Sequence, residues 1–171
     1  MLGRLRNITP CQLALLLAAG ATLTIAAALA YEHLGGYRPC PLCLKERIAY
    51  YAAIPAGLLA ALMLATGRQP FGRTILVLAA LGLVWNAGLG VYHSGVEWKW
   101  WAGPTECGSL GDLATGGSII EGIETEKRIR CDEASWRFLG LSFAGWSAVI
   151  SLGLAVVGFA AAFRRPSTAQ V

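Results

Sequence analysis

Four apolar stretches without a single charged residue constrain this chain more than any other feature. They cover about residues 11–31, 48–66, 74–92 and 143–163. At about 1.5 Å of rise per residue, helices of these lengths cross the roughly 30 Å hydrocarbon core of a bilayer. Charged residues make up 14% of the chain, against roughly 25% in soluble domains. We therefore predict an all-α membrane protein, a four-helix transmembrane bundle that forms one membrane domain over residues 1–171.

The first stretch has a competing interpretation. Arg4 and Arg6, an apolar run and Ala28-Leu29-Ala30 resemble a signal peptide with its cleavage site. The run is longer than the roughly 7–15 residues of a signal core, so a permanent span is favoured.

Basic residues are unevenly distributed among the connecting segments. With four spans, the N-terminal segment, the 67–73 link and the C-terminal segment share one side, and they hold six Arg and no acidic residue. The loops at 32–47 and 93–142 hold all ten Asp and Glu, with eight Lys and Arg spread over a much greater length. Because a high Lys/Arg density marks cytoplasmic segments, we predict cytoplasmic termini and two loops on the opposite side, which in a bacterium is the periplasm. The basic residues are scattered without interleaved aromatics, which argues against nucleic acid as a partner.

The second loop is long and is predicted to lie partly in the membrane interface. Trp98, Trp100 and Trp101 follow the third span directly, and clustered Trp is typical of the interfacial belt. Residues 118–130 are compatible with a short helix, and 136–141 resemble an amphipathic re-entry into the fourth span.

Two cysteines in the first loop form a Cys40-Pro41-Leu42-Cys43 motif. The second helix is predicted to begin near Leu44, which would place Cys43 at a helix N-terminus, where amides and the helix dipole stabilise a thiolate. The motif therefore suits a redox-active pair in a compartment where disulfides persist. A static loop disulfide and half of a metal site are the alternatives.

Arg47 and His93 are candidate groups for a quinone. Arg47 follows Cys43 by four residues, so both project from one helix face, and its guanidinium can donate to a quinone carbonyl in the headgroup region. The alternative is a snorkelling interfacial arginine. His93 ends the third span near the same level and can hydrogen-bond a quinone or simply sit at the interface. Glu46 is interpreted as a partner of Lys45 or a solvated residue.

A second cysteine pair lies in the long loop. Cys107 and Cys131 form a second outward pair, and four outward cysteines allow three pairings, of which Cys40–Cys43 with Cys107–Cys131 is the simplest. A zinc site built from all four is disfavoured because the second pair is separated by 23 residues. We assign no metal ligand.

Two residues within the spans are given structural roles. Cys11 is interpreted as a small buried hydrophobe, and Asn86 as an interhelical hydrogen-bonding residue.

These motifs together resemble the DsbB family, the disulfide bond formation proteins of bacterial inner membranes. The resemblance covers nearly the whole chain and rests on several motifs in the family's order. They are Pro39-Cys40-x-x-Cys43, Glu46-Arg47, Tyr92-His93, Cys107, Cys131 with Glu133, Trp136, Phe138-Leu139-Gly140-Leu141 and Trp146.

The resemblance implies a quinone-dependent thiol oxidoreductase. Such a protein re-oxidises a periplasmic thioredoxin-fold oxidant, DsbA, and passes two electrons to ubiquinone or menaquinone in the membrane; this family is known to keep the periplasm oxidising. It further implies that Cys107 is attacked by the partner, that Cys131 is its disulfide mate, and that a Cys40–Cys131 disulfide forms in transit. Cys43 and Arg47 would then face the quinone, with His93 nearby. The rival reading is a non-catalytic membrane protein with structural disulfides or a zinc site.

Overall fold

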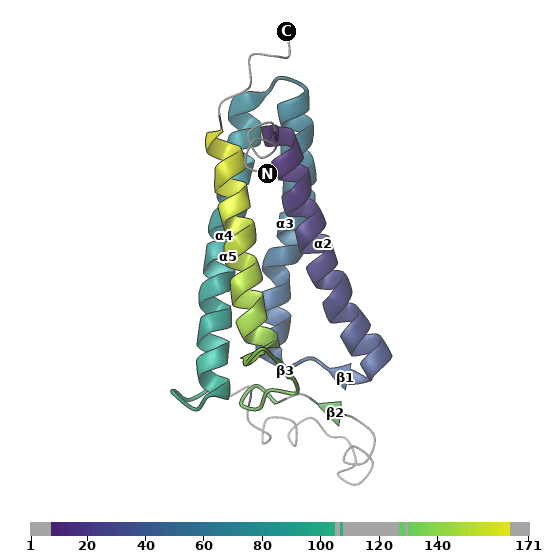
Figure 1. Ribbon diagram of the computed structural model, residues 1–171, viewed down its shortest axis with the longest axis vertical. Coiled ribbons are helices and arrows are strands. Elements are labelled where there is room, and N and C mark those ends of the chain that lie inside the picture. The colour runs from purple at the N-terminus through teal and green to yellow at the C-terminus, as the bar shows by residue number, and fades with distance from the viewer. Residues whose placement is uncertain (1–7, 105–106, 108–126, 129, 165–171) are drawn as a thin grey trace.

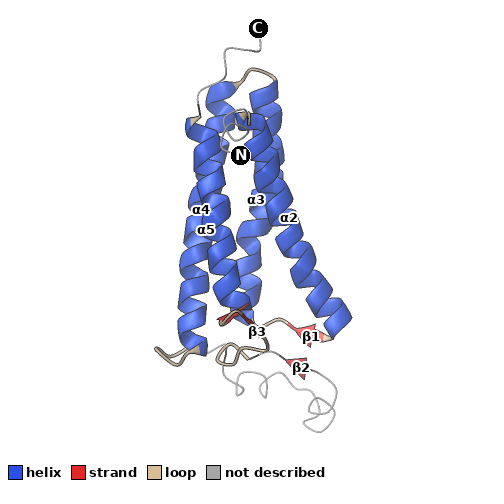
Figure 2. Cartoon of the chain, viewed as in Figure 1, coloured by secondary structure: helices blue, strands red, loops and turns tan. Residues whose placement is uncertain are grey.

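The computed structural model describes residues 8–104, 107, 127–128 and 130–164. Within these residues lie four long helices: α2 (Pro10–Gly35), α3 (Pro41–Ala65), α4 (Gln69–Glu97) and α5 (Phe143–Phe163) (Figure 2). Each is long and apolar enough to cross a membrane, with a mean hydropathy of 1.9 to 2.2 over its most apolar window. The predicted all-α, four-helix transmembrane bundle is confirmed.

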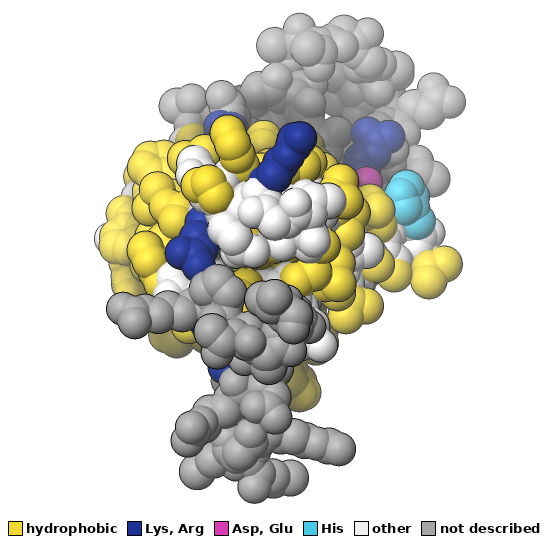
Figure 3. Space-filling model, turned by 90° about the horizontal axis from the view of Figure 1, so that it is seen from above, with side chains coloured by type: hydrophobic (Ala, Val, Ile, Leu, Met, Phe, Trp, Pro, Cys, Tyr) yellow, Lys and Arg dark blue, Asp and Glu magenta, His cyan; other side chains and the backbone are white. Residues whose placement is uncertain are grey.

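The helices form an antiparallel ring. α2 packs on α3, α3 on α4 and α4 on α5, and α5 closes the ring against α2. The start of α2, the α3–α4 turn and the end of α5 lie at one end of the elongated bundle, and the short strands lie at the other (Figure 1). Seen from the first end, the described helices have a largely hydrophobic rim, with several Lys and Arg side chains on that end (Figure 3).

Capping residues fix where the helices begin and end. The hydroxyl of Thr9 accepts the backbone N–H of Gln12, whose side chain accepts the N–H of Thr9 in return. This reciprocal capping box, followed by Pro10, starts α2. The helix stops at Gly36, whose φ of 69° is a left-handed conformation that suits glycine. Ser142 caps α5 in the same way as Thr9 caps α2, by accepting the N–H of Gly145.

Small residues bring the helices together. A Cβ on Gly90 of α4 would lie 2.9 Å from the Ala144 carbonyl oxygen and from the Ala148 nitrogen, both in α5. A Cβ on Gly57 of α3 would likewise lie 3.0 Å from the Cβ of Ala18 in α2. Such close approach replaces the hydrophobic driving force that helices lack inside lipid.

One polar network joins three helices inside the bundle. Asn86 of α4 donates to the Ser151 hydroxyl of α5 at 2.9 Å, and the Tyr50 hydroxyl of α3 lies 2.7 Å from the same oxygen. All three side chains are buried. The interhelical hydrogen bond predicted for Asn86 is therefore confirmed. Cys11, predicted to be buried, is half-buried and donates to the Ala61 carbonyl.

Two short strand pairs cover the other end of the bundle. β1 (Tyr37–Arg38) pairs in parallel with β2 (Lys127–Arg128), and this pairing links the short α2–α3 connection to the long α4–α5 connection. Residues 118–126 and 129 of the helix expected at 118–130 lie outside the described residues. At 127–128 that expectation is wrong, because these residues extend to hydrogen-bond with β1.

The stretch expected to re-enter the membrane as an amphipathic segment contains a tight hairpin. β3 (Arg137–Phe138) pairs antiparallel with β4 (Leu141–Ser142) through a two-residue turn. Leu139 and Gly140 both have positive φ, 52° and 82°, as a type I′ turn requires. The hairpin leads directly into the capped start of α5.

Candidate active site

The Cys40–Cys43 motif forms the first turn of α3. The helix begins at Pro41 with Cys40 as its N-cap, earlier than the start expected near Leu44. The apolar stretch begins only at residue 48, but the helix extends from it through Arg47, Glu46 and Lys45 back to Pro41. The backbone N–H groups at the start of the helix consequently point toward Cys40, whose Sγ accepts a hydrogen bond from the backbone N–H of Cys43 at 3.2 Å. The cysteine at the helix N-terminus is thus Cys40, and Cys43 lies within the first turn.

This position stabilises the Cys40 thiolate. The hydrogen bond with the Cys43 thiol lowers the pKa of Cys40 below its ordinary value. Burial opposes this effect, whereas the backbone N–H groups of Cys43 and Leu42 reinforce it. A lowered pKa places more of Cys40 in the form that attacks disulfides.

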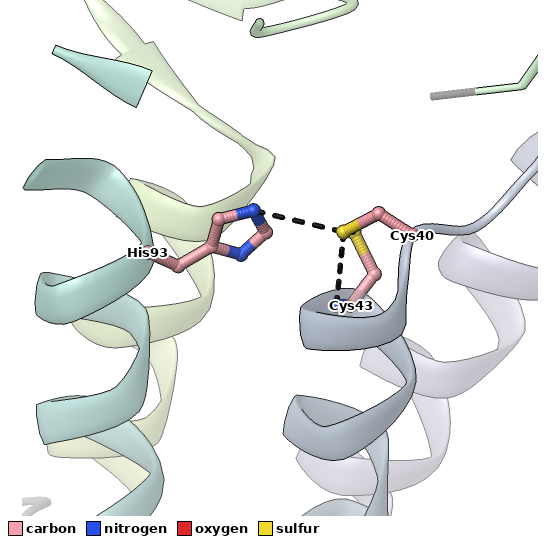
Figure 4. Close-up of side chains that lie close together, drawn as sticks. All are labelled: Cys40, Cys43 and His93. Carbon is pink, nitrogen blue, oxygen red and sulfur yellow. Dashed lines mark hydrogen bonds between the residues drawn. The ribbon is translucent and has the colours of Figure 1, made fainter. Parts of the chain in front are cut away.

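The two sulfurs and a histidine converge at this helix start. Both cysteines are reduced, and their Sγ atoms are 2.8 Å apart. His93 projects from α4 toward Cys40, with Nε2 3.7 Å from its Sγ (Figure 4). A disulfide needs a sulfur separation of about 2.05 Å, so the pair is close to bonding distance.

Glu46 is buried and holds His93 in place. Its Oε1 lies 2.7 Å from His93 Nδ1, and both side chains are buried. The interpretation of Glu46 as a partner of Lys45 or a solvated residue is wrong. An ionised carboxylate only accepts hydrogen bonds, so Nδ1 donates to Glu46 and Nε2 faces the Cys40 sulfur. The available signal was the spacing, because Glu46 lies one turn beyond Cys43 on the same helix.

Arg47 pairs with Glu32 at the end of α2. Its Nη1 donates to Glu32 Oε2, and 13% of the Arg47 side chain is exposed. The contact links the beginning of α3 to the last turn of α2, across the short loop that joins the two helices. Local sequence patterns carry no signal for this pair, because its members belong to different helices.

A cavity of about 360 Å³ lies beside these groups, in the size range of small-molecule sites. Its wall is mainly apolar and aromatic, and α2, α3 and α5 contribute most of it. At this end α2 leans away from the other helices (Figure 1). The candidate residues Cys43, Arg47 and His93 all line the cavity, whereas Cys40 does not. The aromatic part of the wall consists of Tyr31, Tyr37, Tyr50, Trp136, Phe138, Phe143 and Trp146.

Glu97 is a further cavity residue that the sequence reasoning missed. It lies one turn after His93 in α4, which is the spacing that could have revealed it. Its Oε2 is buried without a hydrogen-bond partner among the described residues. An unpaired buried carboxylate oxygen in the wall of an apolar cavity indicates a place for a polar atom of a ligand.

The second cysteine pair is oxidised. Cys107 and Cys131 form a disulfide, which is one part of the simplest pairing predicted from the sequence. Cys131 is buried in one cluster with Cys40 and Leu42, against which Cys43 and Cys107 pack. Cys40, Cys43, Cys107 and Cys131 therefore meet in one place, with one pair bonded and the other reduced.

Salt bridges anchor the segment that follows Cys131. Asp132 accepts from Lys99 at 2.7 Å and from Arg130 at 3.0 Å. These hydrogen bonds, that from Arg130 above all, lower the pKa of Asp132 to about 2. The pairing ties the end of α4 to the segment that carries Cys131.

Comparison with known proteins agrees with this arrangement. The family model "Disulfide bond formation protein DsbB" matches residues 10–161. A protein of Marinobacter nauticus named "Disulfide bond formation protein B" is 33% identical over 152 residues, which cover 84% of this chain and 86% of the relative. Proteins of the same name from Xanthomonas euvesicatoria pv. vesicatoria and Acidovorax sp. are 32% and 29% identical, over 83% and 88% of this chain and 86% of each relative.

No solved structure matches the chain. The family assignment therefore rests on the sequence matches, and the fold with its two cysteine pairs fits a thiol oxidase. Four apolar helices and the family indicate a multi-pass protein of the inner membrane. The reading as a non-catalytic membrane protein is not favoured. With a family model covering most of its length and relatives above 30% identity, the chain belongs to the DsbB family of disulfide-generating thiol oxidoreductases.

Proposed function

We propose that this protein re-oxidises a periplasmic DsbA-like dithiol and passes the electrons to ubiquinone or menaquinone. The observation that carries the proposal is the single buried cluster of Cys40, Cys131 and Leu42, in which a disulfide meets a dithiol. The reduced Cys43 also lines an apolar cavity that suits a quinone head group.

The first stage is thiol–disulfide exchange with the partner. A partner thiolate attacks Cys107 Sγ, which breaks the Cys107–Cys131 bond, forms a mixed disulfide and releases the Cys131 thiolate. The second partner thiol then displaces Cys107, so the partner leaves oxidised and the Cys107/Cys131 pair is reduced. Two electrons have moved from the partner to the protein.

The second stage moves the electrons within the cluster. The Cys131 thiolate attacks Cys40 of an oxidised Cys40–Cys43 pair, and Cys43 leaves as a thiolate. Attack of Cys107 on Cys131 restores the Cys107–Cys131 bond and releases Cys40. The arrangement described above, with Cys107–Cys131 bonded and Cys40 and Cys43 reduced, corresponds to the state before electrons leave the protein.

The third stage re-forms the Cys40–Cys43 bond. A quinone, when bound, supplies an acceptor for two electrons and two protons. Glu46 orients His93 so that Nε2 can take the Cys40 proton, and Arg47 can donate hydrogen bonds to an acceptor oxygen in the cavity. The unpaired Oε2 of Glu97 provides a hydrogen-bond acceptor in the same wall.

The proposed topology places this chemistry outside the cytoplasm. The chain would form one membrane domain over 1–171, with both termini cytoplasmic and both cysteine loops periplasmic. The distribution of basic residues supports this orientation, because the segments at the α3–α4 end hold six Arg and no acid. The periplasm is also where protein disulfides persist.

A reconstituted assay tests the proposal. Purified protein, a reduced DsbA-like partner and a soluble quinone are mixed, and quinone absorbance is followed. We expect catalytic quinone reduction by the wild type and none by Cys43→Ser. The control is Cys11→Ser, which should reduce quinone like the wild type, because Cys11 lies at the start of α2, far along the helix from the residues that line the cavity. Absence of quinone reduction by the wild type, or full reduction by Cys43→Ser, contradicts the proposal.

Arg47 is tested separately at limiting quinone. Arg47→Ala removes the fixed positive charge beside Cys43, so quinone reduction should slow while exchange between the partner and Cys107–Cys131 continues at the normal rate. Unchanged quinone reduction by this variant would exclude the role given to Arg47.

A further inference from the structure

The reduced Cys40–Cys43 pair and His93 have the composition of a metal site. Cys40 Sγ, Cys43 Sγ and a His93 ring nitrogen all lie within 4.8 Å of one another. The three side chains come from the first turn of α3 and the last part of α4, and they point to a common centre (Figure 4). We propose that these three side chains bind one thiophilic divalent cation, such as Zn²⁺, when Cys40 and Cys43 are reduced.

The distances suit a tetrahedral ion after a small adjustment. Zn–S bonds of about 2.3 Å and Zn–N bonds of about 2.0 Å imply S–S and S–N separations of about 3.8 Å and 3.6 Å. The Cys40 Sγ to His93 Nε2 distance is already 3.7 Å. The Sγ–Sγ distance of 2.8 Å must widen by about 1 Å, which rotation of the half-buried Cys43 side chain can provide.

Glu46 completes the site from outside. A histidine that ligates a metal usually donates its other ring nitrogen to a carboxylate, which fixes the ring and raises its basicity. Glu46 Oε1 lies 2.7 Å from His93 Nδ1 and leaves Nε2 facing the sulfurs. The arrangement seen at many histidine ligands is therefore present before any ion binds.

Binding replaces protons by the cation. Two thiols lose two protons as two metal–sulfur bonds form, and no electron is transferred, since Zn²⁺ has no redox chemistry. Three protein ligands leave a fourth position for water, and both Cys43 and His93 border the cavity from which water can reach it. The ligand set differs from a four-cysteine zinc site, because Cys107 and Cys131 are bonded to each other.

The site exists in one redox state. A Cys40–Cys43 disulfide offers no thiolate, so oxidation releases the ion. A bound ion in turn coordinates the sulfur lone pairs and keeps the two thiolates from re-forming the disulfide. Zn²⁺ should therefore inhibit quinone reduction reversibly. That consequence rests on the proposed function, whereas binding of the ion does not.

Cobalt provides a direct spectroscopic test. The Cys107→Ser/Cys131→Ser variant, reduced with a phosphine in detergent, is titrated with Co²⁺. We expect thiolate-to-cobalt charge-transfer absorption and the visible bands of a tetrahedral site, saturating at one ion per chain and abolished by Zn²⁺. Prior oxidation of Cys40 and Cys43 should prevent the spectrum from appearing.

Matched variants in the same background identify the ligands. Cys43→Ser should abolish the charge-transfer absorption, and His93→Gln should weaken binding at least about 10-fold. Glu46→Gln, which keeps the ligands and a hydrogen-bonding group, should weaken binding by about 10-fold or more. His33→Gln, which changes the other histidine of the chain at an exposed position in α2, and Cys11→Ser should bind like the background.

Three results would overturn the inference. They are no tetrahedral spectrum with the reduced background variant, an equal spectrum with oxidised protein, and unchanged affinity in both His93→Gln and Glu46→Gln. Binding with failed quinone turnover would leave the metal site standing and reject the proposed function alone.

Discussion

The Glu46 carboxylate and the His93 imidazole form a buried pair across the α3–α4 interface, with Oε1 2.7 Å from Nδ1. Glu46 positions a ring nitrogen of His93 beside Cys40 without itself touching the sulfur. Its effect on the chemistry is therefore indirect: the carboxylate fixes the tautomer of the imidazole and stabilises the protonated ring that results when the thiol loses its proton.

Replacing Glu46 by Gln should slow oxidation of the Cys40–Cys43 pair. A neutral amide still accepts a hydrogen bond but no longer stabilises a charged imidazolium, so we expect a loss of about 10-fold or more, within the range of general acid–base effects. Stopped-flow oxidation of the dithiol by a soluble quinone measures it across pH. Glu133→Gln, an exposed carboxylate near Cys131, is the control and should behave like the wild type. Equal rates and pH profiles for Glu46→Gln and wild type would contradict the role.

The titration of Cys40 should depend on Cys43. Because the hydrogen bond with the Cys43 thiol is the largest cause that lowers the Cys40 pKa, Cys43→Ala should raise that pKa toward the ordinary value. A lowered pKa means that Cys40 ionisation stabilises the reduced fold at high pH, and that this contribution is lost as pH falls through the lowered value. Ultraviolet absorbance of the thiolate in the Cys107→Ser/Cys131→Ser background follows the titration. An unshifted curve in Cys43→Ala would contradict the assignment.

Sequence patterns predicted the four helices of this protein more accurately than the contacts within its candidate active site. Hydropathy predicts the four helices because lipid accepts little except an apolar, internally hydrogen-bonded segment. Hydropathy does not give the start of α3, which lies at Pro41, outside the apolar stretch. A helix can continue beyond the hydrocarbon when its first turn is capped, and Cys40 provides that cap here. Charge alone suggested a solvated Glu46, whereas burial of that carboxylate depends on a histidine forty-seven residues away in α4.

Gly90 should tolerate no side chain. In Gly90→Ala the new Cβ would lie 2.9 Å from backbone atoms of α5, so the α4–α5 contact must open, at a cost of about 1–3 kcal/mol. A lowered midpoint of thermal unfolding in detergent would report this cost. Gly82→Ala, in the same helix with nothing near its Cβ position, is the matched control and should not lower it. Equal midpoints for the two variants would show that close packing at Gly90 is unimportant.

Filling the cavity should weaken quinone use alone. Ala28 lines the cavity from α2, so Ala28→Trp should raise the KM for a soluble quinone several-fold. Exchange between Cys107–Cys131 and the partner should be unaffected, because that pair is absent from the cavity wall. Leu23→Trp places the same side chain at an exposed position of α2 and should leave KM unchanged. A KM unaffected by Ala28→Trp would argue against this cavity as the quinone site.

The Asp132 salt bridges should protect the Cys107–Cys131 disulfide in a pH-dependent way. The pKa of Asp132 is about 2, below the ordinary value of about 3.9, so its stabilising effect is complete above about pH 4 and is lost as pH falls toward 2. Because Asp132 is partly exposed, water and salt screen the pairs, and we expect at most about 1 kcal/mol. Asp132→Asn should therefore be reduced by a phosphine up to about 5-fold faster than wild type at neutral pH. The difference should shrink in high salt and disappear near pH 2. A difference that persists at pH 2 would mean that Asn disturbs packing next to Cys131, not that an ion pair has been lost.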